Sequence, residues 1–485
     1  MGLLSRKKAG SAVKSNPRAR DENVDAVGME TSSGSAAESH PEGVLKGADR
    51  THLLEPKYAV EMSDRRLELI LAKCSREYGE AVRDNFDKLA EAPNRPEGMK
   101  YFDELLGLNS SRPEEIQKLK LSGQKVIGFF CMFVPKELIM ALGAVPIRMC
   151  SGIAATIYPS EELLPNVLCP MIKSSLGLKI SCMSPYFESC DAIVVPITCD
   201  GKSKLGEILQ DYLPTIQMNI PRRRDNPHII EFIDNELKTL IAELEAVTGT
   251  QLKAGALKDA IKITQAEQKV HIRLQELRKG RGAPLWGRDA LMVAQAQFYD
   301  DTERWTAQVN SLCDELEVRV NNGVSVVPKD APRILLTGSP VIFPNFKIPH
   351  LIEEHGGIIV ADETCAGSRN LKEPVVVDEW IKHDMLRALT EKYILPCTCA
   401  CFTPNLARMD ILTELVEAYE IDGVCYHVLR GCLNYDIESR KIERLLKSHN
   451  IPMLKVETDY AQEDVEQIRT RIEAFLEMIT ARKRK

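Results

Sequence analysis

Short apolar runs alternate with amphipathic stretches over most of this chain. The runs KVIGFF and DAIVVPIT are apolar at consecutive positions, which is typical of strands buried on both faces. Helical patterns separate such runs, for example PKELIMALG (135–143), which proline opens, and NLARMDILTELVEAYE (405–420). The predicted strands are 125–130, 144–149, 191–198, 333–338, 357–362, 422–429 and 452–460. Strands that alternate with helices predict an α/β fold with parallel sheets.

Long amphipathic helices, such as EFIDNELKTLIAELEAV, separate two stretches of this α/β pattern. A chain of 485 residues is also too long for one ordinary core. The first residues are rich in Ser, Ala, Gly and charge, which is typical of disorder. We predict a disordered tail at 1–55, a helical N-terminal segment at 56–120, a first α/β domain at 121–230, a helical insertion at 231–330 and a second α/β domain at 331–485.

Charge and hydropathy exclude several classes of protein. The net charge is −7 and no basic stripe interrupts the body of the chain, which argues against a nucleic-acid-binding surface. No apolar run approaches the roughly 18 residues needed to span a bilayer. The first residues also lack the apolar core of a signal peptide. We therefore expect a cytoplasmic protein that does not bind membranes.

The chain has 14 cysteines, and a reducing cytoplasm disfavours disulfides between them. Cys74, Cys313 and Cys425 lie within apolar helix or strand patterns, so we interpret them as small buried hydrophobes. Others follow predicted strand ends, namely Cys131, Cys199, Cys365 and Cys432. In open parallel sheets, ligands bind at the carboxyl ends of the strands. Two such domains facing each other would bring these thiols into one cleft.

The spacing of the cysteines bears on which metal such a cleft would hold. The chain has no C-x-x-C pair of the kind that zinc sites use, and no C-x₂-C-x₂-C ferredoxin run. Thiolates gathered singly from several loops suit an iron–sulfur cluster shared between segments. Spacing alone leaves scattered core cysteines as an equal alternative.

Several segments, in order from about residue 75 to 480, resemble one known family. GFFCMFVPKELIMALGAVPIRMCSG, VLCPMIKSSLG, ITCDGKSK, ADETCAGSR and DGVCYHVLRGC are similar to signatures of the 2-hydroxyacyl-CoA dehydratase D-component superfamily. Within it, the sequence looks most similar to the double-cubane cluster proteins, which are homodimeric, ATP-dependent reductases. The resemblance implies two Rossmann or flavodoxin-like domains with the cluster in the cleft between them.

The resemblance also implies cluster ligands. The positions that match the dehydratase ligands are Cys169, Cys199 and Cys432. A double cubane needs about twice as many thiolates, and the further candidates are Cys131, Cys365, Cys399 and Cys401, with Cys397 as a spare. Cys150 and Cys182 also lie at family positions, and we give them less weight as ligands. The tail has no counterpart in the family pattern, and Ser203 stands where many relatives carry lysine.

Three polar residues are candidates for holding the cofactor or an anionic substrate. Lys202 and Lys204 closely follow Cys199, where they would lie near a negative cluster or, equally, form a solvated helix start. Ser174 would donate to the cluster or form a polar turn. No catalytic residue is assigned from the sequence.

The sequence contains no phosphate-binding loop, since GKS at 201–203 lacks the earlier glycine of G-x-x-x-x-G-K-[ST]. The resemblance implies that ATP is used by a separate dimeric iron–sulfur ATPase, and that this chain forms a homodimer. We expect a double-cubane [8Fe–9S] reductase that acts on a small molecule or a CoA thioester. The alternatives are a 2-hydroxyacyl-CoA dehydratase subunit with one [4Fe–4S] cluster, and a non-catalytic protein that holds a cluster.

Overall fold

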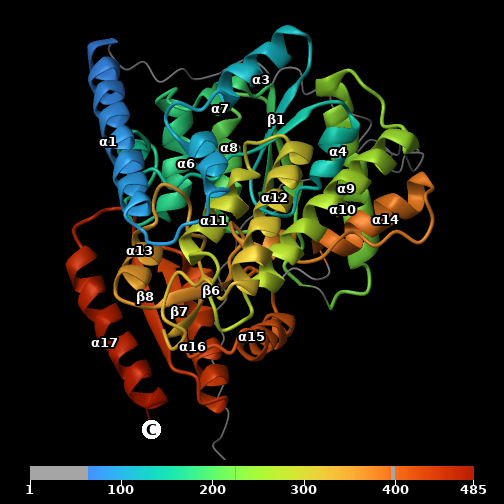
Figure 1. Ribbon diagram of the computed structural model, residues 1–485. Coiled ribbons are helices and arrows are strands. Elements are labelled where there is room, and N and C mark those ends of the chain that lie inside the picture. The colour runs from blue at the N-terminus through green and yellow to red at the C-terminus, as the bar shows by residue number, and fades with distance from the viewer. Residues whose placement is uncertain (1–63, 224, 395–398, 485) are drawn as a thin grey trace, which may run out of the picture. The chain divides into compact units, whose positions relative to one another are not determined.

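The computed structural model describes residues 64–223, 225–394 and 399–484, all within one compact unit of the chain. The predicted tail at 1–55 lies outside the described residues, as does Cys397. No helix in the described part is long and apolar enough to cross a membrane. The two α/β regions contain two separate four-stranded sheets (Figure 1).

The first sheet is parallel throughout, with strand order β2-β1-β3-β4. Its strands are β1 (Val126–Phe129), β2 (Val145–Arg148), β3 (Ala192–Ile197) and β4 (Thr215–Asn219). β1 is buried at every position, as expected of a strand covered on both faces. The sequence pattern predicted the first three strands, whereas the more polar edge strand β4 was not predicted.

The second sheet is also parallel, with strand order β6-β5-β7-β8. Its strands are β5 (Arg333–Gly338), β6 (Ile358–Glu363), β7 (Gly423–Leu429) and β8 (Met453–Thr458), and all four were predicted. In each sheet β1 or β5 pairs with strands on both sides, so the chain order reverses there. The prediction of an α/β fold with two parallel sheets is confirmed.

Helices fill the regions between and around the strands. Those before the second sheet are α1 (Asp64–Ala90), α2 (Met99–Leu106), α3 (Arg112–Leu121), α4 (Lys136–Ala141), η2 (Ala154–Thr156), α5 (Ile157–Ser160), α6 (Pro170–Ile180), α7 (Pro185–Ser189), α8 (Asp200–Leu209), α9 (Ile229–Thr248), α10 (Ala254–Leu277), α11 (Gly287–Ala296) and α12 (Thr302–Asn321). Those after β5 are α13 (Lys347–Glu354), η3 (Ser368–Leu371), α14 (Lys382–Ile394), α15 (Leu406–Ala418), α16 (Leu433–Ser448) and α17 (Val465–Lys483). The helical character predicted for 231–330 is confirmed by α9 to α12.

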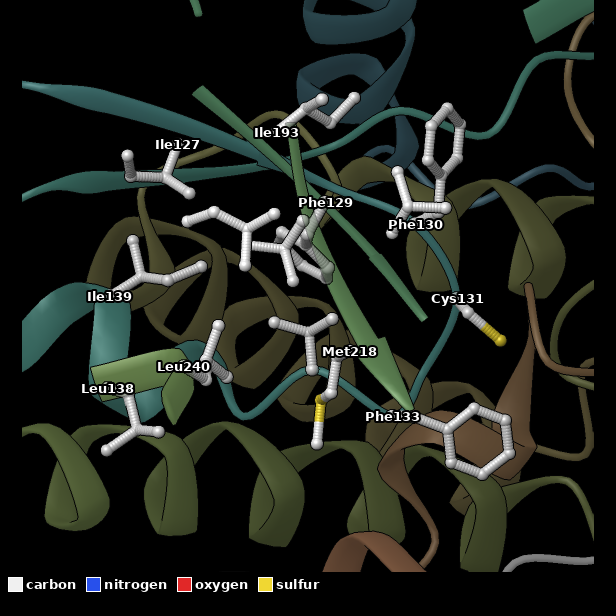
Figure 2. Close-up of a cluster of buried hydrophobic side chains, with 14 of the residues drawn as sticks. Ile127, Phe129, Phe130, Cys131, Phe133, Leu138, Ile139, Ile193, Met218 and Leu240 are labelled. Carbon is white, nitrogen blue, oxygen red and sulfur yellow. The ribbon is translucent and has the colours of Figure 1, made fainter. Parts of the chain in front are cut away.

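The long helices pack onto the sheets and are not an independent domain core. Leu240 of α9 lies in the same buried cluster as Phe129 of β1 and Leu138 of α4. Figure 2 shows these side chains together, with Cys131 at the edge of the cluster and its thiol pointing away from the Phe129 side. The apolar contacts therefore hold the end of β1 in place while leaving Cys131 free to face other groups.

Local sequence determines where several of these helices begin. Asp301 caps α12, its carboxylate accepting from the backbone N–H groups of Glu303 and Arg304. Proline occupies the first position of α6, where no N–H is needed. α9 ends at Gly249, whose left-handed φ of 67° suits glycine.

Candidate metal centre

Three thiols follow the strands of the first sheet at the same offset. Cys131, Cys150 and Cys199 each lie two residues beyond the end of β1, β2 and β3 respectively. Because parallel strands end at one edge of a sheet, this offset brings the three thiols to that edge. Cys131 has a φ of 66°, which is rare for a residue with a side chain and is typical of functional sites.

The second sheet supplies thiols in a similar way. Cys365 lies two residues beyond β6, and Cys432 lies three residues beyond β7. Cys399 and Cys401 come from the segment between α14 and α15. The carboxyl edges of both sheets are therefore rich in cysteine, as the sequence predicted.

Three of the candidate ligands stand at helix starts. Cys169, Cys199 and Cys432 are the N-cap residues of α6, α8 and α16. The hydrogen bond from Cys432 lowers the pKa of Cys169, whereas burial raises the pKa of Cys199, and the hydrogen bond to Cys169 together with burial raises that of Cys432. Backbone N–H groups of the first helical turn act in the opposite direction to burial at all three sulfurs. A helix N-terminus stabilises negative charge, so these positions favour the thiolate form that binds metals.

Gly431 allows two of these helix starts to meet. Its φ is 79°, and a Cβ atom here would stand 2.2 Å from the carbonyl oxygen of Val167. Only glycine therefore permits the loop before α16 to lie against the loop before α6. As a result the Cys432 thiol donates a hydrogen bond to Cys169, and this bond lowers the pKa of Cys169 although burial opposes it.

A second thiol pair lies nearby. The Cys401 thiol donates to Cys399 and lowers the pKa of Cys399 to about 5; burial opposes this shift, and the Arg369 guanidinium assists it. The hydroxyl of Tyr435, on α16, is 3.7 Å from the sulfur of Cys399. Cys399 is thus held as a thiolate by groups from three different segments.

Two buried cations face the thiols. Arg148 is 1% exposed, and its Nη2 donates to the carbonyl oxygen of Cys365 at 2.7 Å. Burial is the largest single effect on Cys150 and would raise its pKa, but the charges of Arg148 and Lys202, with hydrogen bonds from Arg148 and the Cys131 backbone, together lower it. Lys202 is 4% exposed and opposes burial at Cys131, whose pKa still rises to about 12.

All seven candidate ligands lie within electrostatic reach of one another, through a chain of pairwise interactions. Cys131 interacts with Cys365 and Cys399, and Cys199 interacts with Cys399 and Cys432. Cys169 is linked to this group by its hydrogen bond with Cys432, and Cys401 by its hydrogen bond with Cys399. Cys150, which we weighted less as a ligand, belongs to the same group through Cys365. The group combines residues from both sheet regions.

The remaining described cysteines lie elsewhere. Cys74, Cys313 and Cys425 are 2%, 0% and 1% exposed and lie in hydrophobic clusters, so their interpretation as core residues is confirmed. Cys182 is exposed, and its neighbours are Glu188 and Lys179. Cys190 is partly buried, and its thiol donates to the Tyr186 carbonyl at 3.3 Å.

The three polar candidates occupy different environments. The Ser174 hydroxyl is fully buried and bonded to Ser151, Thr156 and the Ile153 carbonyl, at 2.6, 2.9 and 2.8 Å. The Lys204 side chain is 70% exposed and pairs with Glu207 at 2.6 Å. Of the three, only Lys202 acts through its charge on the cysteines, for example on Cys131 and Cys199. Cofactor binding stays a prediction for all three residues.

The donor set fits an iron–sulfur cluster better than a single ion. Among the described residues, no three His, Cys, Asp or Glu side chains are arranged to bind one metal ion. In a cubane each thiolate binds a different iron, so its ligands are spread more widely than those of one ion. Eight thiols linked by pairwise interactions, together with buried cations, have the composition that an anionic cluster requires.

A cavity lies beside the thiols. Its volume is about 490 Å³, and its walls include Met132, which follows Cys131, and Arg369, which interacts with Cys399. Apolar side chains of α10, α14 and α15 form much of the remainder, for example Ile272, Ala388 and Ile411. This volume is in the range of small-molecule pockets.

Sequence reasoning did not find the residues that surround the thiols, notably Arg148, Arg369, Tyr435 and Tyr460. Tyr460 is 2% exposed, and its hydroxyl donates to the Ser151 carbonyl at 2.9 Å, which joins β8 to the loop after β2. The signal for Arg148 was available, since a charged residue ends the otherwise apolar strand AVPIRM. The sequence around Tyr435 has a helical pattern in which nothing marks this tyrosine as a neighbour of the thiols.

The fold and the site together define an α/β protein with two parallel sheets and a cysteine-lined centre between their carboxyl edges. The family described as "2-hydroxyglutaryl-CoA dehydratase, D-component" matches residues 131–479, and the chain belongs to this family. The sequence-based identification is thereby confirmed.

Relatives with assigned names support this membership. The chain is 34% identical over 366 residues to "Putative dehydratase subunit YjiM" of Escherichia coli (strain K12), covering 75% of this chain and 94% of that protein. It is 21% identical to the (R)-phenyllactyl-CoA dehydratase beta subunit of Clostridium sporogenes, over 78% of this chain and 99% of the relative. It is also 21% identical to the beta subunit of (R)-2-hydroxyglutaryl-CoA dehydratase from Acidaminococcus fermentans, over 78% and 98%.

Proposed function

We propose that this chain is an iron–sulfur subunit of a 2-hydroxyacyl-CoA dehydratase. This proposal rests mainly on one observation: the two sheet regions of a chain of this family bring the candidate thiols together. The relatives favour this dehydratase alternative over the double-cubane reductase that the sequence first indicated. The reaction would remove the hydroxyl from C2 and a hydrogen from C3 of the acyl group, giving a 2-enoyl thioester and water.

Different residues of the centre would contribute to cluster binding, substrate binding and charge stabilisation. Cys169, Cys199 and Cys432 would hold the cluster, which supplies one-electron chemistry when bound. The adjacent cavity would receive the acyl group, because its walls are largely apolar and Met132 places it beside the thiols. The fixed cations near the thiols would stabilise negative charge that develops there.

One observation favours the double-cubane reductase as a second candidate. The group contains Cys131, Cys150, Cys365, Cys399 and Cys401 in addition to the three dehydratase-type ligands. A single cubane does not need so many thiolates. The additional thiols would instead complete a larger cluster.

Iron and acid-labile sulfide, measured on anaerobically purified protein, test both candidates. We expect about four irons per chain for one cubane and about eight for a double cubane. The dehydratase assignment also predicts turnover of a 2-hydroxyacyl-CoA once a partner subunit and an electron source are present. Bound zinc without iron would refute both candidates, and would leave the thiols as a zinc site.

The relatives are named as subunits, so we propose that this chain also acts with another protein. The sequence resemblance implies a homodimer, whereas the dehydratase assignment implies a second, different subunit. Mass measurement of the complex isolated from its native source distinguishes these two assemblies.

A further inference from the structure

Arg148 is a buried cation without a carboxylate partner among the described residues. Its Nε and Nη1 atoms are buried and have no hydrogen-bond partner there, and its plane lies 4.3 Å from the ring centroid of Phe298. Its Nη2 donates to a neutral carbonyl group, that of Cys365, and the guanidinium also interacts with the Cys150 thiol. A guanidinium removed from water in this way is costly unless negative charge compensates it.

Lys202, on α8, is a second buried cation whose charge acts on Cys131. It is 4% exposed, its Nζ lies 4.3 Å from the ring centroid of Phe130, and no carboxylate of the described chain pairs with it. Other buried cations of the protein do have such partners, as in Lys136 with Glu267 and Arg408 with Glu363. Arg278 and Arg333 are also buried without an ion pair among the described residues, but they bond to an amide and to carbonyl oxygens. Arg148 and Lys202 differ from these two in that thiols surround them.

Water alone does not account for this arrangement. Arg148 borders a small cavity of about 20 Å³, which has room for roughly one water molecule. A water there could accept from a free N–H group, but it could not neutralise the guanidinium. Glu267 and Asp300 also border this cavity, but they form ion pairs with Lys136 and Arg304. Burial lowers the pKa of Arg148, and the groups that raise it are the thiols of Cys150, Cys365 and Cys131.

We propose that Arg148 and Lys202 are the counter-cations of the anionic cluster that the surrounding thiolates hold. This inference rests on the proposed function, since it requires an iron–sulfur cluster in this centre. Each thiolate ligand adds one negative charge, and reduction adds another, so two fixed positive charges stabilise the reduced state more than the oxidised state. The two residues thus position the cofactor and raise its reduction potential without touching substrate.

The test uses anaerobic holo-protein and four neutralising variants. Arg148→Met and Lys202→Met remove the proposed counter-charges, and Arg148→Lys retains the charge at the same site. Lys204→Met is the control on α8, because Lys204 is exposed and paired with Glu207. Arg333→Met is the control for a buried arginine: Arg333 is 2% exposed and bonds to the carbonyls of Tyr419, Gly280 and Lys279.

The first readout is the midpoint potential, from a redox titration followed by EPR, with iron content measured in parallel. Arg148→Met and Lys202→Met should shift the potential downward, Arg148→Lys should stay closer to the unmodified protein, and both controls should leave it unchanged. An unchanged potential in Arg148→Met with full iron would overturn the proposal. Absence of iron in the unmodified protein would instead refute the proposed function.

The second readout applies if Arg148→Met loses its cluster. Thermal stability is then compared in chelator-stripped protein, where no cluster compensates the guanidinium. Stripped Arg148→Met should be at least as stable as the stripped unmodified protein, whereas Arg333→Met should be less stable. A large loss of stability in stripped Arg148→Met would assign Arg148 a structural role and overturn the proposal.

Discussion

Cys169, Cys199 and Cys432 differ from core thiols such as Cys313 in what surrounds the sulfur. The first three stand at helix starts and close to other thiols, while Cys313 is fully buried in α12 among apolar side chains. The helix N–H groups favour the thiolate at these three positions, although only the pKa of Cys169 is lowered overall, and burial still raises the pKa of Cys199. Burial raises the pKa of Cys313 to about 12, which keeps it a neutral thiol.

Serine substitution tests this distinction. Replacing Cys169, Cys199 or Cys432 by serine should remove most of the bound iron and the activity, because iron–sulfur clusters require thiolate ligands. Cys74→Ser and Cys313→Ser should retain both, with a moderate loss of stability from a buried hydroxyl. Iron analysis and activity of each variant give the comparison. Equal iron loss in both groups would show that position at a strand end has no bearing on ligation.

Gly431 is the residue on which the contact between two ligand loops depends. Gly431→Ala combines a left-handed φ of 79° with a Cβ atom 2.2 Å from the Val167 oxygen. Gly143→Ala is a matched control, since Gly143 has a φ of 74° and open space around it. We expect Gly143→Ala to cost about 1 kcal/mol from strain alone. Gly431→Ala should cost clearly more and should also lower the iron content, as urea unfolding and iron analysis would show. If both substitutions changed stability and iron content equally, the contact between the two ligand loops would not contribute to either property.

The sequence predicted the candidate thiols better than it predicted their surroundings. Cysteines after apolar runs are visible as a pattern, and the family signatures extend that pattern to Cys399 and Cys401. Arg148 and Tyr435 act through contacts between segments distant in sequence, as when Tyr435 of α16 approaches Cys399. Such contacts depend on the packing of the two sheets, which periodicity does not encode.

At the scale of elements, the side chain of Glu353 connects helix α13 with helix α11 and strand β6. It lies on α13, and its carboxylate accepts from the backbone N–H of Gly287 at 2.7 Å and of Arg288 at 3.3 Å, which caps the start of α11. The backbone N–H of Ile359 in β6 also donates to it at 3.3 Å. Complete burial raises the pKa of Glu353 to about 7, although Arg288 and these donors oppose the shift.

This raised pKa predicts a pH-dependent contribution to stability. The folded protein binds the Glu353 proton more tightly than the unfolded chain, so the contribution is fully present below the ordinary pKa of about 4.5 and is lost as pH rises toward 7. Relative to Glu353→Gln, the unmodified protein should lose about 1.4 kcal/mol per pH unit across that window. Urea unfolding at pH 5, 6 and 7 measures the difference, with Glu354→Gln on the exposed side of α13 as the control. A difference that is constant with pH would show that Glu353 titrates normally.

The elements themselves were predicted to different degrees. Seven strands follow from apolar runs because both faces of a parallel sheet are buried. β4 was missed because its sequence TIQMN carries polar residues at an edge position, where one of the five residues is exposed and another is only partly buried. α14 was missed because its sequence, KHDMLRALTEKYI, has only a weak amphipathic pattern, and its burial depends on packing against α9 and α10.

At the scale of the molecule, the central helices connect the two sheet regions. α10 packs against α4 beside the first sheet, and α11 packs against β6 and α13 of the second. Glu137 of α4 accepts from Thr264 of α10 at 2.9 Å and from the Tyr393 hydroxyl of α14 at 2.7 Å. The helical insertion predicted at 231–330 therefore packs against the two sheet regions that supply the cysteine centre. The predicted domain boundaries stay a prediction, which limited proteolysis would test.

The last prediction concerns how the whole molecule receives electrons. The sequence contains no phosphate-binding loop, and the family resemblance implies low-potential chemistry driven by a separate ATPase. The purified protein should therefore neither bind ATP in calorimetry nor turn over with ATP and a mild reductant. Adding the cognate iron–sulfur ATPase with ATP should start turnover of a 2-hydroxyacyl-CoA or another small substrate, and a non-hydrolysable analogue should not. Tight ATP binding by the isolated chain, or sustained turnover without the partner, would show that energy coupling resides in this protein itself.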